Sequence, residues 1–386
     1  MAVSDPDLPY RSYAAAIGTC VVLLGALLGL STSPALVERL FTEGLGTTAG
    51  RIVSALSSTV PISLAEWVEG ALIAWLILAP VPALRSVLRK ERTLGNAARS
   101  GILQLLSLAG LALVLFYGLW GLNYGRAPAI ERLGWQPVEL SGAEADDELA
   151  QLSEALVDRV NGLYLQLHGS EDVGTISIPA APLDLDVILD AGWRRVAEDL
   201  ALHEAVALPR GPAKPLLSSP VWSYLGIAGF YFPFTGEANF NRDQPLWQQT
   251  HTIAHEKAHQ RGMASEDEAN FFGFLACIRS DEPYVQYGGW LFAQRRILYA
   301  LIQSDPERAQ AIVERRLPGV QRDVDEMRAF WLGYAGVGSD VGSAVNNAYL
   351  RANGVEGGIQ SYSLSIRLIV AWAREQPGAQ DHIDNL

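Results

Sequence analysis

The sequence predicts a multi-pass membrane protein with three N-terminal transmembrane helices, followed by a mainly helical α+β domain. Hydrophobic residues make up 49% of the 386 residues and charged residues only 18%, whereas ordinary soluble domains carry about 25% charged residues. The chain is also about twice as long as a usual single domain. A membrane anchor and at least one further domain are therefore expected.

Three segments near the N-terminus have the length and apolarity of bilayer spans, which need about 20 mostly apolar residues. They are residues 13–30, 67–84 and 101–124. The first and third carry no charge, and Glu69 lies in the first turn of the second, where its carboxylate can reach the headgroups. The third contains Trp120 and ends at Tyr124, as in an aromatic belt. Residues 1–124 are therefore predicted to form the membrane anchor.

The charges of the connecting loops predict the topology, because Lys and Arg accumulate on the cytoplasmic side of membranes. The loop between the second and third spans is strongly basic, with Arg85, Arg89, Lys90, Arg92 and Arg99. The loop 31–66 carries only Arg39 and Arg51 beside several acids. The N-terminus is therefore expected in the cytoplasm, and everything after Tyr124 is expected outside it.

From Gly125 onward the sequence reads as that of a water-soluble protein in two parts. Residues 125–210 are predicted to be helical, because apolar residues recur at helical spacing in the stretches 147–167 and 185–202. A stretch rich in Pro, Gly and Ser at 209–220 marks a boundary. Residues 211–386 are predicted to form a separate domain.

Within that last part, the aromatic and β-branched stretch from Val221 to Phe234 predicts a short sheet or hairpin. The sequence from Gln244 to the end has mainly helical patterns. The net charge of −13 argues against binding of nucleic acid. Cys20 and Cys277 are too far apart in sequence, and in different parts of the protein, to form a disulfide framework or a cysteine–zinc cluster.

The residues that predict chemistry are three of the six histidines, His251, His255 and His259. His255, Glu256 and His259 form an HExxH pattern. On a helix, two imidazoles at positions i and i+4 share a face and can bind one zinc ion at about 2.1 Å. Glu256 then lies beside the remaining coordination position, where it can take a proton from water as general base. His251 is about 12 Å along the axis from His259, too far to bind the same ion.

A third zinc ligand is predicted just after this helix. Ser265 and Glu268 have the spacing of a capping box, which predicts a second helix from about Glu266. Because the turn is short, the two helices should run antiparallel and bring Glu266 beside His259. Glu266 is therefore favoured as third ligand, and Glu268 remains the alternative. Asn270, one turn further, is expected to approach the outer nitrogen of His255.

Glu266 followed by Asn270 four residues later resembles the second-helix motif of the gluzincin metallopeptidases. More widely, the sequence resembles an uncharacterised bacterial family of membrane proteins, the domain of unknown function 3810. The residues that carry this resemblance are 226–239, the HExxHQ-x-G motif, 266–277, 345–350 and the pair Ser361-Tyr362. The resemblance implies a zinc metallopeptidase of the bacterial cell membrane without an established substrate.

For several further residues the sequence allows both a functional and a purely structural role. Tyr349 and Tyr362 are candidates for a hydroxyl that stabilises an oxyanion. The stretch 221–234 is either an edge strand that pairs with an extended peptide or an aromatic core segment. Glu237 and Asn239 either line the cleft or cap a turn.

The sequence thus predicts a membrane-anchored, zinc-dependent peptidase with a zincin-like domain, acting on a peptide or protein substrate. The alternative is a catalytically silent, zinc-binding envelope sensor or assembly factor. An intramembrane protease is disfavoured because the motif is surrounded by side chains that are costly in hydrocarbon. These are Arg242, Asp243, Lys257 and Arg261. The site is therefore expected in water or at the membrane surface.

Overall fold

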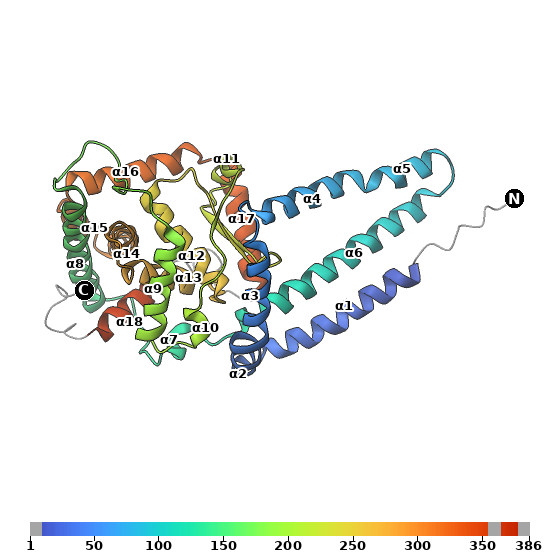
Figure 1. Cartoon of the computed structure of the whole chain (residues 1–386), viewed down its shortest axis with the longest axis horizontal. Coiled ribbons are helices and arrows are strands. Elements are labelled where there is room, and N and C mark those ends of the chain that lie inside the picture. Colours follow the sequence, from blue (N-terminus) through green and yellow to red (C-terminus); the bar gives the residue numbers. More distant parts are fainter. Residues whose placement is uncertain (1–9, 354–363, 377–386) are drawn as a thin grey trace.

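The computed structural model describes residues 10–353 and 364–376, in which three long helical arms extend from one end of a helical domain (Figure 1). The arms are α1 (Tyr10–Ser31), α4 (Leu64–Leu78) continued by α5 (Pro80–Leu88), and α6 (Leu94–Leu119). All three are long and apolar enough to cross a membrane, and almost none of their residues are buried in the protein. The predicted membrane association is therefore supported.

The third of these helices ends at Leu119, five residues before the predicted end of the span at Tyr124. Trp120 has φ −154°, and residues Gly121–Gly125 form the 3-10 helix η2. This tight turn carries the chain from the span into the domain. The second span is interrupted at Pro80, which cannot donate a backbone hydrogen bond to the preceding turn.

The segment between the first two spans, expected only as a loop, contains three short helices. They are α2 (Pro34–Leu36), the π-helix η1 (Val37–Leu45) and α3 (Gly46–Ser57). These helices lie where the arms meet the domain (Figure 1). Arg126, just after η2, binds Glu38 of η1 through two hydrogen bonds of 2.7 and 2.8 Å. This segment is therefore attached to the end of the domain from which the arms extend.

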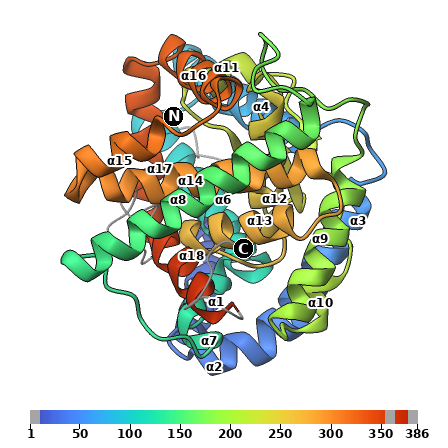
Figure 2. The same cartoon turned by 90° about the vertical axis from the view of Figure 1, so that its left-hand side faces the viewer.

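The domain is formed mostly by helices. In chain order they are α7 (Ala129–Arg132), α8 (Ala143–His168), α9 (Leu185–Asp199), α10 (Glu204–Ala207), α11 (Ser219–Tyr224), α12 (Leu246–Gln260), α13 (Glu266–Ile278), α14 (Pro283–Ser304), α15 (Pro306–Val313), α16 (Pro318–Gly333), α17 (Val337–Ala352) and α18 (Leu364–Glu375). One hydrophobic core runs from Ala129 to Trp372, so that residues before and after position 210 pack together. At the end of the domain away from the arms, α8 and α14 lie side by side (Figure 2).

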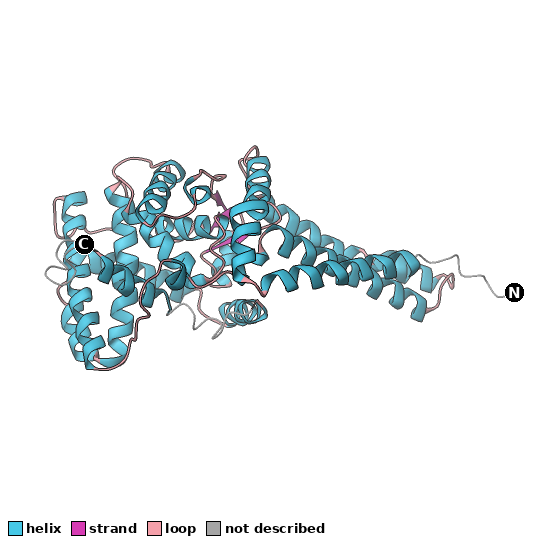
Figure 3. Ribbon diagram, turned by 90° about the horizontal axis from the view of Figure 1, so that it is seen from below, coloured by secondary structure: helices cyan, strands magenta, loops and turns pink. Residues whose placement is uncertain are grey.

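The only sheet in the described ranges has three short strands and lies close to the arms (Figure 3). Its order is β1 (Lys214–Pro215), β3 (Glu237–Phe240), β2 (Gly229–Phe232), with β3 parallel to β1 and antiparallel to β2. Of the stretch 221–234, predicted to form a short sheet or hairpin, only β2 is a strand, and its hairpin partner β3 lies beyond this stretch. The first part of the stretch is helical, with Pro220 in the first turn of α11. Strand β2 is the edge of the sheet.

Two residues of β3, Glu237 and Asn239, hold the start of the second span. The Glu237 carboxylate accepts hydrogen bonds from the backbone N–H groups of Leu64 (3.2 Å) and Ala65 (2.8 Å), at the positive end of α4. It also pairs with buried Lys214. The Ser63 hydroxyl donates to Asn239 Oδ1 at 2.7 Å. Glu237 therefore caps the N-terminus of α4, and these contacts fix the sheet to the second of the three arms.

Candidate metal centre

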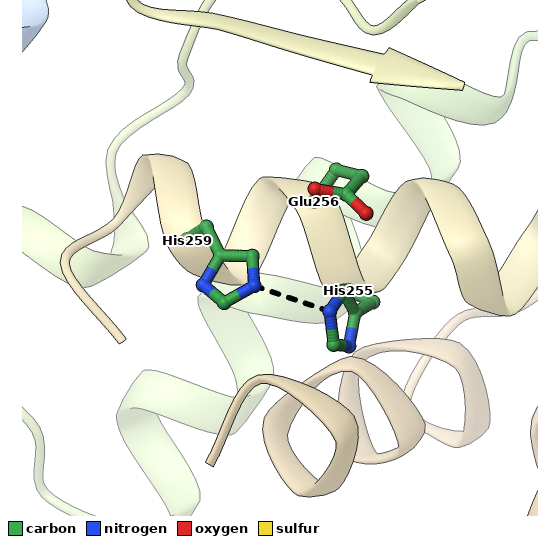
Figure 4. A group of neighbouring side chains, drawn as sticks. All are labelled: His255, Glu256 and His259. Atoms are coloured by element: carbon green, nitrogen blue, oxygen red, sulfur yellow. Dashed lines mark hydrogen bonds between the residues drawn. The ribbon is translucent and has the colours of Figure 1, made fainter. Parts of the chain in front are cut away.

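The HExxH residues lie in the second half of α12, a helix that is buried along most of its length. The helix ends before Gly262, whose φ of +87° is readily adopted only by glycine. The rings of His255 and His259 point to the same side of the helix, and their Nε2 atoms are 3.1 Å apart (Figure 4). The spacing i, i+4 therefore brings the two imidazoles together as predicted.

Helix α13 adds Glu266 to this pair. Its carboxylate oxygens are 3.2 Å from His255 Nε2 and 3.7 Å from His259 Nε2. Two ligand atoms that are each about 2.1 Å from a tetrahedral zinc ion lie about 3.4 Å apart. The three separations of 3.1, 3.2 and 3.7 Å fit such an ion.

The close packing of α12 and α13 depends on Gly273. A Cβ at this position would lie 2.9 Å from the backbone nitrogen of His255. Glu266 lies near His259, whereas the carbonyl of Asn270 is 3.1 Å from His251 Nε2, so the two helices run antiparallel. The predicted helix hairpin is present.

Several buried polar atoms at the centre have no hydrogen-bond partner among the residues that the structure describes. They are His255 Nδ1, Glu256 Oε2 and Asn270 Nδ2. The expected hydrogen bond from Asn270 to His255 is therefore not formed, whereas His259 Nδ1 has the Met263 carbonyl at 2.7 Å. The ligand atoms of His255, Glu256 and His259 lie within 4.8 Å of one another and could hold a metal ion.

Burial is the largest cause of the pKa shifts of His259 and Glu256. It lowers the pKa of His259 to about 4, which keeps the imidazole in the neutral form that binds metals. It raises the pKa of Glu256 to about 8, with a smaller contribution from the charge of Glu266. A carboxyl group whose pKa lies near neutral pH can both take up and release a proton, as general acid–base catalysis requires.

Strand β2 covers Glu256 through Gly229. A Cβ at position 229 would lie 2.8 Å from Glu256 Oε1 and 2.7 Å from the carbonyl of Asn239. The strand therefore approaches the carboxylate so closely that only glycine fits without displacement. This contact fixes the Glu256 side chain between α12 and strand β2.

Glu268, the alternative ligand, points elsewhere and pairs with Arg132. The capping box that was expected to occupy it is not formed, because the Ser265 side chain makes no capping hydrogen bond. Helix α13 nevertheless begins at Glu266, as predicted. The position of Glu266 beside both imidazoles agrees with the predicted antiparallel helices, whereas the predicted capping box is absent.

The opposite face of α12 is fixed to α9 by charge pairs. Lys257 Nζ is 2.8 Å from Asp186 Oδ1, and Arg261 Nη2 is 2.7 Å from Asp190 Oδ1. Both basic side chains are fully buried in protein. Both side chains therefore fix α12 to α9 and do not face solvent.

A cleft of about 1050 Å³ opens over the centre between β2 and α17. Tyr349 of α17 lines it, and its hydroxyl is 3.2 Å from that of Tyr124. Tyr349 is 39% exposed, and a tyrosine hydroxyl keeps its proton at neutral pH. Tyr362, the other candidate, lies outside the described residues.

Two further side chains at the centre were not predicted in these positions. His251 is buried and stacks on Phe292 with ring centroids 3.5 Å apart. Trp120 donates a hydrogen bond from its indole to the His259 carbonyl. The sequence signal for Trp120 was only its place at the end of a span.

Comparison with known families agrees with the expected resemblance. Residues 41–370 match the family described as "Protein of unknown function (DUF3810)". The chain belongs to the DUF3810 family. This match includes α12, α13 and most of the cleft. No curated protein and no solved structure matches the chain.

Proposed function

We propose that this DUF3810 protein is a membrane-anchored, zinc-dependent metallopeptidase. The observation that carries the proposal is the convergence of His255 Nε2, His259 Nε2 and the Glu266 carboxylate within 3.7 Å. Two imidazoles and one carboxylate are a ligand set of catalytic zinc sites, which leave a position open. In this proposal the three residues hold zinc, and Glu256 is the general base.

Bound zinc would supply Lewis-acid activation of water and of the peptide carbonyl. Glu256 takes the proton from the attacking water and passes it to the leaving amine. The free edge of β2 offers backbone groups to an extended peptide. Tyr349 offers a protonated hydroxyl on the opposite wall, suited to stabilise the developing oxyanion.

The proposed location of the domain is outside the cytoplasm. It rests on the basic loop between the second and third spans, which includes Arg85, Arg89 and Arg92. A reporter fused to the C-terminus tests it. If the fusion carries a reporter that functions only in the cytoplasm and this reporter is active, the orientation is contradicted.

The proposal is tested with purified full-length protein in detergent, by measuring zinc content and cleavage of a peptide library. We expect one zinc ion per chain and cleavage by the wild type. Glu256→Gln should retain zinc and lose cleavage. A wild type that holds full zinc and cleaves no peptide would instead support the silent sensor or assembly factor.

A further inference from the structure

The cleft has a second polar region, away from the metal centre, formed by arginines. Arg295 and Arg296 come from α14, and Arg316 precedes α16. Among the described residues that line the cleft, Glu256 and Glu266 are the only carboxylates, and both belong to the metal centre. A group of three guanidinium groups is unexpected in a chain with a net charge of −13.

Among the described residues, neither Arg295 nor Arg316 forms an ion pair with a carboxylate, although the charge of Asp325 acts on Arg316. Arg316 donates to two neutral amides, Gln294 Oε1 at 2.9 Å and Gln321 Oε1 at 3.1 Å. No side chain in the described ranges forms a hydrogen bond or an ion pair with Arg295. Burial, and then the charges of Arg296 and Arg316, lower the pKa of Arg295 to about 10. Clustered like charges are unfavourable in a partly buried site, and a bound anion would offset this cost.

Arg295 and Arg316 line the same cleft as the candidate metal ligands, and ring contacts lead from the neighbouring Arg296 towards His255. The Arg296 guanidinium lies 5.2 Å from the ring centroid of Phe292, which stacks on His251. The His251 ring is in turn 6.2 Å from that of His255. The arginines and the metal centre are therefore parts of one binding cleft.

We propose that Arg295 and Arg316 form an anion-binding subsite for a carboxylate of the peptide substrate. This inference rests on the proposed peptidase function and names its substrate class: peptides with an acidic side chain, or a free C-terminal carboxylate, within a few residues of the cleaved bond. The planar guanidinium suits a carboxylate because it can donate two parallel hydrogen bonds.

The position of the subsite favours a peptide over a lipid headgroup as the source of the anion. Helices α14 and α15 lie farther from the membrane arms than α12 does (Figure 1). The wall near the arginines is also apolar, with Val313, Val324 and Met327. Apolar walls lower the local dielectric constant and strengthen the attraction between a guanidinium and a carboxylate.

The test uses full-length enzyme in detergent and peptides that share one cleavable neutral sequence. One series carries Asp, Asn or Lys at each position around the cleaved bond, and a second ends in a free carboxylate or an amide. We expect the wild type to prefer one anionic form by about tenfold in kcat/KM, equal to about 1.4 kcal/mol. The series that shows the preference identifies the carboxylate as a side chain or a C-terminus.

Substitution of Arg295 should change this preference. Arg295→Gln should reduce the ratio of kcat/KM between paired peptides to about one, and Arg295→Glu should favour Lys peptides. Arg295→Lys should keep the direction of the preference but weaken it, because an ammonium group cannot donate two parallel hydrogen bonds in the plane of a carboxylate. Arg315→Gln is the matched control, because Arg315 is exposed and pairs with Asp158 outside the cleft. Zinc content verifies the fold of each variant. If Arg295→Glu loses zinc, the peptide preference of Arg295→Gln alone serves as the test of the subsite.

Equal cleavage of paired peptides by the wild type, or the same preference in Arg295→Gln, would overturn the subsite and leave the peptidase proposal intact. Zinc-loaded wild type that cleaves none of the peptides would overturn the peptidase proposal itself. Inhibition of the wild type but not of Arg295→Gln by short-chain phosphatidylglycerol, without a peptide preference, would assign the site to a lipid instead.

Discussion

The indole N–H of Trp120 donates a hydrogen bond of 2.8 Å to the backbone carbonyl of His259. Trp120 directly follows the last residue of α6. The uncharged stretch from Ser100 to Leu119 would be about 30 Å long as a helix, which matches the hydrocarbon core of a bilayer. The metal centre is therefore attached to the end of a membrane span, where tryptophan is enriched.

Trp120→Phe should weaken this attachment while it keeps an aromatic ring in place. Loss of the indole donor leaves the His259 carbonyl with backbone donors such as the N–H of Gly262, at 3.0 Å, and removal of the indole hydrogen bond costs about 1 kcal/mol. We expect a lower melting temperature and weaker zinc binding, measured by thermal unfolding and by metal competition. Trp67→Phe is the control, because Trp67 is exposed on α4. Equal effects of the two substitutions would show that the hydrogen bond has no specific role.

Glu266→Gln and Glu268→Gln distinguish the two candidate ligands. Glu266→Gln removes a charged oxygen ligand and should lower zinc affinity by about tenfold or more, as loss of metal-site contacts does. Glu268→Gln should lower stability through its pairing with Arg132 and leave zinc affinity nearly unchanged. Competition with a chelator measures both. The opposite order of affinities would assign the third ligand to Glu268.

Removal of the metal should lower the stability of the whole domain. Helices α12 and α13 meet at His255, His259 and Glu266, so a bound ion would link them. At a free zinc concentration about 100 times the Kd, binding contributes about 2.7 kcal/mol to the folded state. We expect a chelator to lower the melting temperature and added zinc to restore it. An unchanged melting temperature in chelator would contradict a metal held at this site.

The parts of the site that the sequence predicted depend on short separations along the chain. His255 and His259 share a helix face at any α-helical geometry, and Glu266 follows them across one tight turn. Trp120 could not be predicted to contact His259, because 139 residues separate them and only the folded chain brings them together. The same holds for Glu237, which is 172 residues from Ala65 in the helix that it caps.

Lys214 and Glu237 form a buried ion pair that should matter for stability. Both side chains are almost fully inaccessible, at 2% and 1% exposure. Removal of one partner from a buried pair leaves an uncompensated charge and costs about 3–5 kcal/mol. Glu237→Gln should therefore unfold at a clearly lower denaturant concentration. The double variant Lys214→Met/Glu237→Gln should recover part of the loss, and a strictly additive loss would show that the pair is not coupled.

Gly229→Ala tests whether the contact between β2 and Glu256 positions the general base. The added Cβ would lie 2.8 Å from Glu256 Oε1 and 2.7 Å from the carbonyl of Asn239, so the carboxylate or the strand must move. A displacement of about 1 Å in a catalytic group can lower the rate by about 100-fold. We expect a large loss of kcat with zinc content unchanged, because the atoms nearest to the added Cβ belong to Asn239 and Glu256 and not to the predicted ligands. Gly162→Ala in α8, where a Cβ meets no atom within 4 Å, is the control and should keep full activity. Full activity of Gly229→Ala would mean that Glu256 acts without support from the strand.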